Sequence, residues 1–470
     1  MRNVLLVLPV LLLASSAAAE TRPAQVALTE ATVAARAIRS SREVAVAAAE
    51  VRAAAAEVST AKEAYVPRVT LEGRYTRLSD FTAPPLFSSD GRLVGTTAPA
   101  GTLNPAPTVA VALGDTRFPV IVDNWFLQAQ LAVPISDYFL RIQGGVRAAN
   151  AGKDAAEYAA TEARGRAVLG ALGAYYTWHR ALRVQSLARL AVEDQKAHLA
   201  DAEKLLAEGL GREVDVLRAR TGLANARATE SESARGVAMS EARLGIALDL
   251  RDASFVSDEV FELPPTPASL ERLLTEAYEK RPELARLRAL DAQAHAAESI
   301  AEQGRFPTLV GVANATLANP NPRRIPQSNE WFPTWDASVV VRWNLDEIIT
   351  GTSKAKAFHE KRGAIQENLL RLRDGIRLEI MDARTELETA RVHASANEEA
   401  LSAATEAHRL ARIGFREGKA SGATVLDAET DLMRARVGEL ETRVAAKLSA
   451  VRLAYAVGRL AAESDRSAKP

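Results

Sequence analysis

Apolar residues recur with helical spacing over most of this chain. Residues three and four positions apart lie on one face of a helix, so this spacing predicts amphipathic helices. The predicted helices cover residues 28–64, 137–208, 213–250, 282–304, 346–416 and 422–460. Two of them, 137–208 and 346–416, run for about 70 residues without a proline, which gives rods roughly 105 Å long at helical rise. Rods of this length exceed what a globular core needs.

The period changes from helical to two in four short stretches. In the first of these, Val69, Leu71 and Tyr75 alternate with charged or hydroxyl side chains. This alternation predicts strands with one apolar and one polar face. The predicted strands are 68–78, 124–133, 308–317 and 334–343. A loop rich in Pro, Gly, Ser and Thr (79–122) joins the first two, and a shorter one (318–333) joins the last two.

One sequence stretch occurs twice. The segment 208–227 matches 417–436 at a constant offset, with the glycine pair Gly209 and Gly418 near the start of each copy. Each copy lies between two helical patterns, so each predicts a tight turn between antiparallel helices. The order helix, strand, loop, strand, long helix, turn, helix also occurs twice, which indicates a duplication. The predicted parts are a first repeat (20–250), a linker or equatorial segment (251–281), a second repeat (282–462) and a polar tail (463–470).

The N-terminus has the features of a signal peptide. Arg2 precedes a short apolar run, and Ala17-Ala18-Ala19 forms a small-residue cleavage site. The alternative, a membrane anchor, needs about 20 apolar residues, and this run is shorter. We therefore expect segment 1–19 to be removed after Ala19. No cysteine follows the site, so no lipid anchor is expected.

Composition excludes several classes of protein. The chain has 470 residues, zero formal net charge and no cysteine. Without a basic surface there is no electrostatic argument for a nucleic-acid partner, and without cysteine there are no disulfides or thiolate metal sites. The six histidines are scattered through helices with no metal-binding spacing. No catalytic residue, cofactor or metal site is predicted, so the sequence does not favour an enzyme.

The strands have the length and alternation of membrane-spanning barrel strands. Aromatic residues near their ends are typical of a membrane-interface belt. These residues are Tyr75, Trp125, Trp331, Trp335 and Trp343. A soluble two-sided sheet is the alternative. Four strands cannot close a membrane barrel, whose smallest type has about eight, so a barrel would require three chains and twelve strands. The rods then form a helical tube, or else a solid coiled coil in a periplasmic or surface scaffold.

The chain resembles the TolC family of outer-membrane efflux proteins over essentially all of its predicted mature length. The resemblance rests on Arg281-Pro282-Glu283, on Pro67 and Pro307 at helix-to-strand junctions, on Val133-Pro134-Ile135, and on the two duplicated turns. It implies a mainly α fold with a membrane β-barrel portion: a homotrimer whose twelve-stranded barrel in outer-membrane lipid continues as a twelve-helix periplasmic tube. The implied function is an outer-membrane exit duct of a tripartite efflux or secretion system. The implied partners are a periplasmic adaptor and an inner-membrane pump of open class.

The resemblance also implies site residues at the two turns. The adaptor-docking tips would be Gly209, Leu210, Gly211 and Arg212 in one turn, and Gly418, Lys419, Ala420, Ser421, Gly422 and Ala423 in the other. The periplasmic entrance would be formed by Asp215, Phe415, Thr424 and Asp427. Thr424 stands where the family often has a first aspartate, so Asp427 alone is expected to form an acidic ring. Two alternatives remain: the glycines only make the turns, or Asp427 pairs with a neighbouring Arg or Lys.

Overall fold

A computed structural model describes residues 25–80, 82, 93–94, 108–109, 120–251, 253–257, 259 and 261–461. The predicted signal peptide, most of the 79–122 loop and the polar tail lie outside the described residues. The fold is mostly helical, and the chain divides into two compact units. The first unit comprises Met1–Glu50, Ala156–Arg286 and Leu369–Pro470, and the second comprises Val51–Ala155 and Leu287–Asn368.

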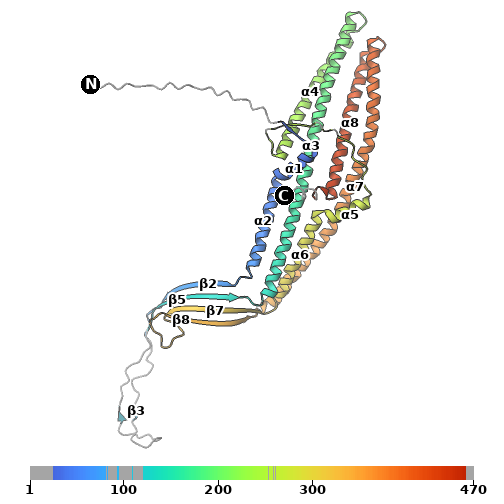
Figure 1. Ribbon diagram of the computed structural model, residues 1–470. Coiled ribbons are helices and arrows are strands. Elements are labelled where there is room, and N and C mark those ends of the chain that lie inside the picture. Colours follow the sequence, from blue (N-terminus) through green and yellow to red (C-terminus); the bar gives the residue numbers. More distant parts are fainter. Residues whose placement is uncertain are drawn as a thin grey trace, which may run out of the picture. The chain divides into compact units, whose positions relative to one another are not determined.

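The second unit contains an antiparallel sheet of four strands in the order β2-β5-β7-β8 (Figure 1). The strands are β2 (Arg68–Arg77), β5 (Asp123–Val133), β7 (Thr308–Asn319) and β8 (Phe332–Arg342). β7 and β8 each extend two residues further into their connection than the alternation predicts, because their pairing continues to Ala318 and Phe332. A separate short pair, β3 (Leu93–Val94) with β4 (Thr108–Val109), lies in the connection between β2 and β5.

The register gives this sheet two different faces. Leu71 lies opposite Ala129, Ala129 opposite Ala315, and Ala315 opposite Trp335. Residues directly opposite one another share a face, and alternate residues along a strand return to it. The face so defined includes Val69, Leu71, Tyr75, Trp125, Leu127, Leu131, Ala313, Leu317, Val339 and Val341. The other face includes Arg68, Thr70, Glu72, Arg74, Gln128, Gln130, Asn314, Thr316, Asp336 and Ser338.

The sheet is open in the single chain. Within the described residues, β2 pairs only with β5 and β8 only with β7, so each has one edge without a ladder partner. The exposed apolar side chains of the first face are not covered: Leu71 is 79% exposed and Val339 64%. A sheet with an uncovered apolar face and two free edges needs a further partner to satisfy both.

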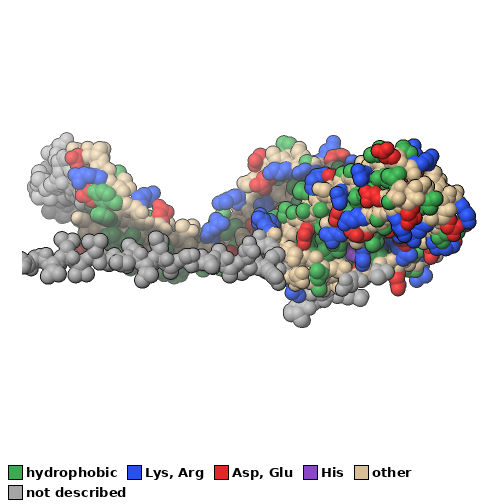
Figure 2. Space-filling view, turned by 90° about the horizontal axis from the view of Figure 1, so that it is seen from above, with side chains coloured by type: hydrophobic (Ala, Val, Ile, Leu, Met, Phe, Trp, Pro, Cys, Tyr) green, Lys and Arg blue, Asp and Glu red, His purple; other side chains and the backbone are tan. Residues whose placement is uncertain are grey.

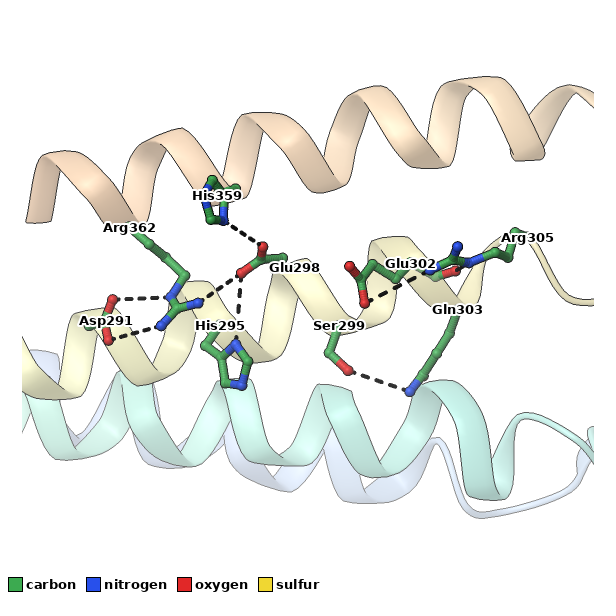
Figure 3. Close-up of polar contacts among 9 residues, drawn as sticks. All are labelled: Asp291, His295, Glu298, Ser299, Glu302, Gln303, Arg305, His359 and Arg362. Carbon is green, nitrogen blue, oxygen red and sulfur yellow. Dashed lines mark hydrogen bonds and ion pairs between the residues drawn. The ribbon is translucent and has the colours of Figure 1, made fainter.

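Helices of the second unit are held together partly by ion pairs. α6 (Pro282–Gln303) begins at the proline that the sequence places in a first helical turn, and α7 spans Asp346–Arg416. Arg362 of α7 binds Asp291 at 3.1 Å and Glu298 at 3.0 Å, and His359 lies 3.2 Å from Glu298 (Figure 3). Glu298 is largely enclosed by these side chains, and its hydrogen bond to Arg362 lowers its pKa.

The predicted helix 28–64 is two helices. α1 (Glu30–Ser40) and α2 (Arg42–Glu63) are separated by Ser41, whose φ of −67° and ψ of 122° are extended. Alanine-rich periodicity continues through this point, so the pattern could not show the break. The predicted helix 137–208 likewise begins with one π-helical segment, η1 (Tyr138–Ile142), before α3 (Gln143–Ala207).

Three apolar clusters of buried residues lie in the described part of the first unit, and the two larger ones form most of its core. The first contains Tyr175, Tyr176 and Trp178 of α3 with Leu244 and Leu248 of α4 (Glu213–Leu248). Phe255, from β6 (Ser254–Val256), joins this cluster, and β6 pairs with β1 (Gln25–Ala27) in parallel. The second cluster joins α5 (Leu270–Lys280), the start of α6 and α7 to α8 (Gly422–Ala456). Its members include Leu273, Leu284, Ile376, Ile380, Leu387 and Leu453. The segment 251–281 is therefore packed against the long helices.

Candidate functional site: the helical tips

The two predicted turns have the same backbone geometry. Gly209 after α3 has a φ of 73°, and Gly418 after α7 has a φ of 69°. Both values lie in the left-handed region that glycine adopts without steric strain. The amides of Leu210 and Gly211 donate to the Leu205 carbonyl at 2.9 and 2.8 Å. At the second turn, two amides donate to the Gly414 carbonyl in the same way, at 2.8 and 3.1 Å.

Each turn needs one small residue at a point of close approach. A Cβ on Gly211 would lie 2.7 Å from the Leu206 nitrogen and 2.9 Å from the Leu205 carbonyl carbon. In the second turn the position of Gly211 is taken by Ala420, and a Cβ on Gly414, which takes the position of Leu205, would lie 3.2 Å from the Ala420 Cβ. The glycine at the close approach is therefore Gly211 in the first turn and Gly414 in the second. The two copies of the repeat show both glycines in the sequence, but not that each lies at the close approach of its own turn.

The predicted docking residues differ in exposure. Leu210 is 74% exposed, and Gly209, Arg212, Gly418 and Lys419 are also exposed. Gly422 is buried against Asp215. A Cβ at this position would lie only 3.1 Å from Asp215 Oδ1. This glycine therefore brings the two tips together, and its surface is not available to a docking partner in the single chain.

The four predicted entrance residues fall into two pairs. Asp215 is buried and accepts from Arg212 at 3.0 Å, and Phe415 is buried in an apolar cluster with Ala202, Val216, Ala219 and Val425. Thr424 and Asp427 are exposed on α8, and the Thr424 amide donates to Ser421 Oγ at 3.3 Å. Among the described residues, Asp427 has no ion-pair partner within 4.0 Å, and Lys419 pairs with Glu417 at 2.7 Å. Of these four residues, only Thr424 and Asp427 are exposed in the single chain.

The five predicted interface aromatics are all exposed. Tyr75 and Trp125 face each other with ring centroids 4.5 Å apart, and the Tyr75 hydroxyl donates to Asp123 at 2.8 Å. Trp343 donates from Nε1 to the Arg305 carbonyl at 3.1 Å, just after β8. Trp331 precedes β8. Trp335 lies inside β8 and not at its end, because the strand begins at Phe332, earlier than predicted. It shares a row of paired residues with Leu71.

A buried polar cluster lies next to the tips and was not found from the sequence. Gln195 of α3 donates to Glu429 of α8, and His408 of α7 places Nε2 3.6 Å from Glu429 Oε1. Burial and, to a lesser extent, the negative charge of Asp194 raise the pKa of Glu429 to about 7, although Arg412 opposes the rise. Burial also lowers the pKa of His408. The three residues lie on three different helices, far apart in the sequence, so no local sequence pattern connects them.

A cavity opens beside this cluster. Its volume is about 510 Å³, and its lining includes Asp194, Gln195, Arg218, Glu429, Met433 and Arg436. Within the part of the chain that the structure describes, no group of three or more His, Cys, Asp or Glu residues is arranged to hold a metal ion. No helix among the described residues is long and apolar enough to cross a membrane. On the helical surface that Figure 2 shows, basic and acidic side chains are intermixed.

Comparison with known proteins identifies the family. The model of the family "outer membrane efflux protein" matches residues 33–248 and 273–459, which is most of the chain. The chain belongs to this family. The resemblance seen in the sequence is thereby confirmed, and this efflux protein is an outer-membrane exit duct for efflux. Its family is one of transport ducts and not of enzymes.

Solved outer-membrane channels share the fold of this efflux protein. The channel OprN is 18% identical, with 91% of this chain and 89% of that chain covered and a TM-score of 0.71. The CmeC channel of Campylobacter jejuni is 15% identical, with coverage of 94% and 89% and a TM-score of 0.71. VceC of Vibrio cholerae is 16% identical, with coverage of 91% and 96% and a TM-score of 0.70. No curated protein matches the chain.

Proposed function

We propose that this efflux protein is a homotrimer in which each chain contributes its four strands to a twelve-stranded outer-membrane barrel. The observation that carries the proposal is the sheet with one apolar face and two free edges. In hydrocarbon every backbone N–H and C=O needs an internal partner, so free edges must be closed. Four strands cannot close on themselves, and three chains of four strands fall within the known range of barrel sizes.

The long helices would form the wall of a periplasmic tube, with the four helices of each chain making twelve in the trimer. Their apolar clusters contain many alanines, such as Ala383, Ala390 and Ala446, which allow neighbouring helices to lie close together. Segment 251–281, packed on these helices, would form part of a belt around the tube.

The tips would dock a periplasmic adaptor that connects the duct to an inner-membrane pump. Leu210 supports this assignment, because an apolar side chain that is 74% exposed at a turn has no role in the packing of its own chain. The left-handed glycines Gly209 and Gly418 keep both turns narrow, so that a partner can approach their backbones closely.

Asp427 would line the periplasmic entrance. It is exposed and has no ion-pair partner among the described residues, so in a trimer three such carboxylates would face a common axis. A ring of like charges in a narrow opening concentrates ions of the opposite sign. The entrance would therefore favour cations, with Thr424 leaving one acidic ring where two are common.

The trimer is tested by fractionating cells that express the full-length chain. We expect a protein that leaves the envelope only with detergent, begins at Glu20 by N-terminal sequencing, carries no lipid, and has three times the chain mass by light scattering corrected for detergent. A monomer in a detergent-free extract would refute the barrel.

A further inference from the structure

Above the turns, α3 and α8 lie between α4 and α7 in the first unit. α3 packs against α4 in the apolar clusters, and it contacts α8 where Gln195 donates to Glu429. α8 in turn contacts α7, where Asn397 donates to the Gly438 carbonyl at 3.1 Å. α4 and α7 are therefore the two outer helices of this part of the chain.

α4 has a packed face and an exposed face on opposite sides. Its buried residues recur every three or four positions, as at Val216, Ala219 and Leu223. A second series, shifted by two residues along the helix, is exposed. Two residues correspond to about 200° around a helix, so this second face points away from the chain's own core. Its uncharged members include Val214, Leu217, Thr221, Ala224, Ala228 and Ala238.

α7 has the same two faces in the part that belongs to the first unit. Its buried residues include Ile380, Leu387 and Ala394. The opposite face is exposed and consists mainly of apolar or small residues, among them Leu378, Met381, Val392, Ala396, Ala403 and Leu410. Every helix in a closed wall has a neighbour on each side. An outer helix with an uncovered apolar face therefore needs its second neighbour from another chain.

The two exposed faces carry opposite charges with the same spacing. Arg220 and Arg227 lie along the face of α4, 7 and 14 positions after its first residue. Glu406 and Glu399 lie on the face of α7, 10 and 17 positions before its last residue. Arg220 and Glu406 each also have an exposed partner in their own chain. Among the described residues, Arg227 and Glu399 have no ion-pair partner within 4.0 Å.

The start of α4 and the end of α7 lie at the same height along the helices. Asp215 in the first turn of α4 packs against Gly422, the first residue of α8, which follows α7 after the second turn. In the proposed trimer the threefold axis runs along the helices, so neighbouring chains keep the same heights. Each arginine of one chain then lies within three residues of helical rise, about 4.5 Å, of a glutamate on the next. Two long side chains can span this offset.

We propose that each seam of the trimer consists of α4 of one chain packed antiparallel against α7 of the next. Arg227 of one chain pairs with Glu399 of the other, and Arg220 pairs with Glu406. Alanines on both faces let the two helices approach closely, and the matched charges fix their register. The two surfaces differ, so the contact is head-to-tail, and a closed ring leaves neither face uncovered. The seam rests on the proposed trimer, whose barrel is argued from the sheet alone.

The pairing is tested by exchanging the charges and measuring the fraction of trimer of the full-length chain in detergent by light scattering. Arg227→Glu and Glu399→Arg should each lower this fraction several-fold, because like charges then meet across the seam. The chain with both substitutions should regain the wild-type fraction. Glu398→Arg is the matched control, since its position is turned by about 100° from Glu399. Combined with Arg227→Glu, it should not restore the trimer.

A second experiment uses the absence of cysteine from the chain. Ala224 and Ala403 lie near the middle of the two exposed faces, 11 positions after the start of α4 and 13 before the end of α7. A chain with both Ala224→Cys and Ala403→Cys should form a covalent trimer on oxidation, because a disulfide needs Cα atoms within about 7 Å. Neither single variant should form a covalent product, because α4 meets α7 and not a second α4.

The outcomes separate the seam from the trimer itself. An intact trimer that neither cross-links through this cysteine pair nor is restored by the charge exchange would refute the seam and leave the barrel standing. A covalent dimer of the Ala224→Cys variant would also refute the seam, because two copies of α4 would then meet. Wild-type protein without trimer would overturn both proposals, and the wild-type sample alone shows this.

Discussion

Placing a charge on the apolar face of the sheet tests the membrane barrel most directly. Leu71 is the fourth residue of β2, and its side chain is 79% exposed. Ala129 and Ala315, which lie beside it on the same face of the sheet, are too small to cover it. In the proposed barrel its side chain faces lipid. Leu71→Arg therefore places a guanidinium in hydrocarbon. The adjacent Thr70, opposite Gln130 on the polar face, provides the matched control Thr70→Arg, which faces the lumen.

The size of the effect follows from the position in the strand. An arginine on the lipid face near the bilayer midplane costs about 2–4 kcal/mol, falling toward zero at the interfaces. Since each of three chains carries the substitution, a trimer would be destabilised by about 6–12 kcal/mol. Thr70→Arg should cost less than about 1 kcal/mol, because a lumenal side chain stays in water.

The measurement is refolding into lipid vesicles over a urea series, with the assembled trimer detected as a band on unboiled gels that shifts on heating. We expect Leu71→Arg to reduce the trimer strongly at urea concentrations that leave wild type and Thr70→Arg assembled. If both variants lose the same amount of trimer, or if the two effects are reversed, the assignment of the apolar face to lipid is wrong.

Three further predictions concern the tips. In planar bilayers, Asp427→Asn should reduce cation preference and weaken block by trivalent cations, whereas unchanged selectivity would show that Asp427 does not line the pore. Replacing Leu210 and Ala423 together with Asp should abolish export while trimer and surface levels stay normal, and normal export would exclude docking at these turns. Gly211→Ala should loosen the first turn by about 1–3 kcal/mol through its backbone clash, while Ala420→Gly costs less than about 1 kcal/mol. Equal hydrogen-exchange protection in these last two variants would contradict the close approach at Gly211.

Local features of this protein were determined by the sequence itself. The predicted helix 346–416 matches α7, Asp346–Arg416, because a long Ala- and Leu-rich run without proline has no competing structure. The two faces of the sheet also follow from the sequence, since side chains alternate strictly along a strand. The turns at Gly209 and Gly418 could be located because a left-handed residue at a helix end is commonly glycine.

Tertiary structure decided how residues on different helices meet. Ser41 interrupts a helix whose periodicity continues through it, and no local preference distinguishes this serine from others nearby. Gly422 is buried against Asp215, and Gln195, His408 and Glu429 gather from three helices. Such contacts depend on the rotation and axial offset of packed helices, which many side chains set together. The periodicity of a helix shows only approximately which side of that helix a residue lies on. It therefore cannot show which residue of another helix lies opposite.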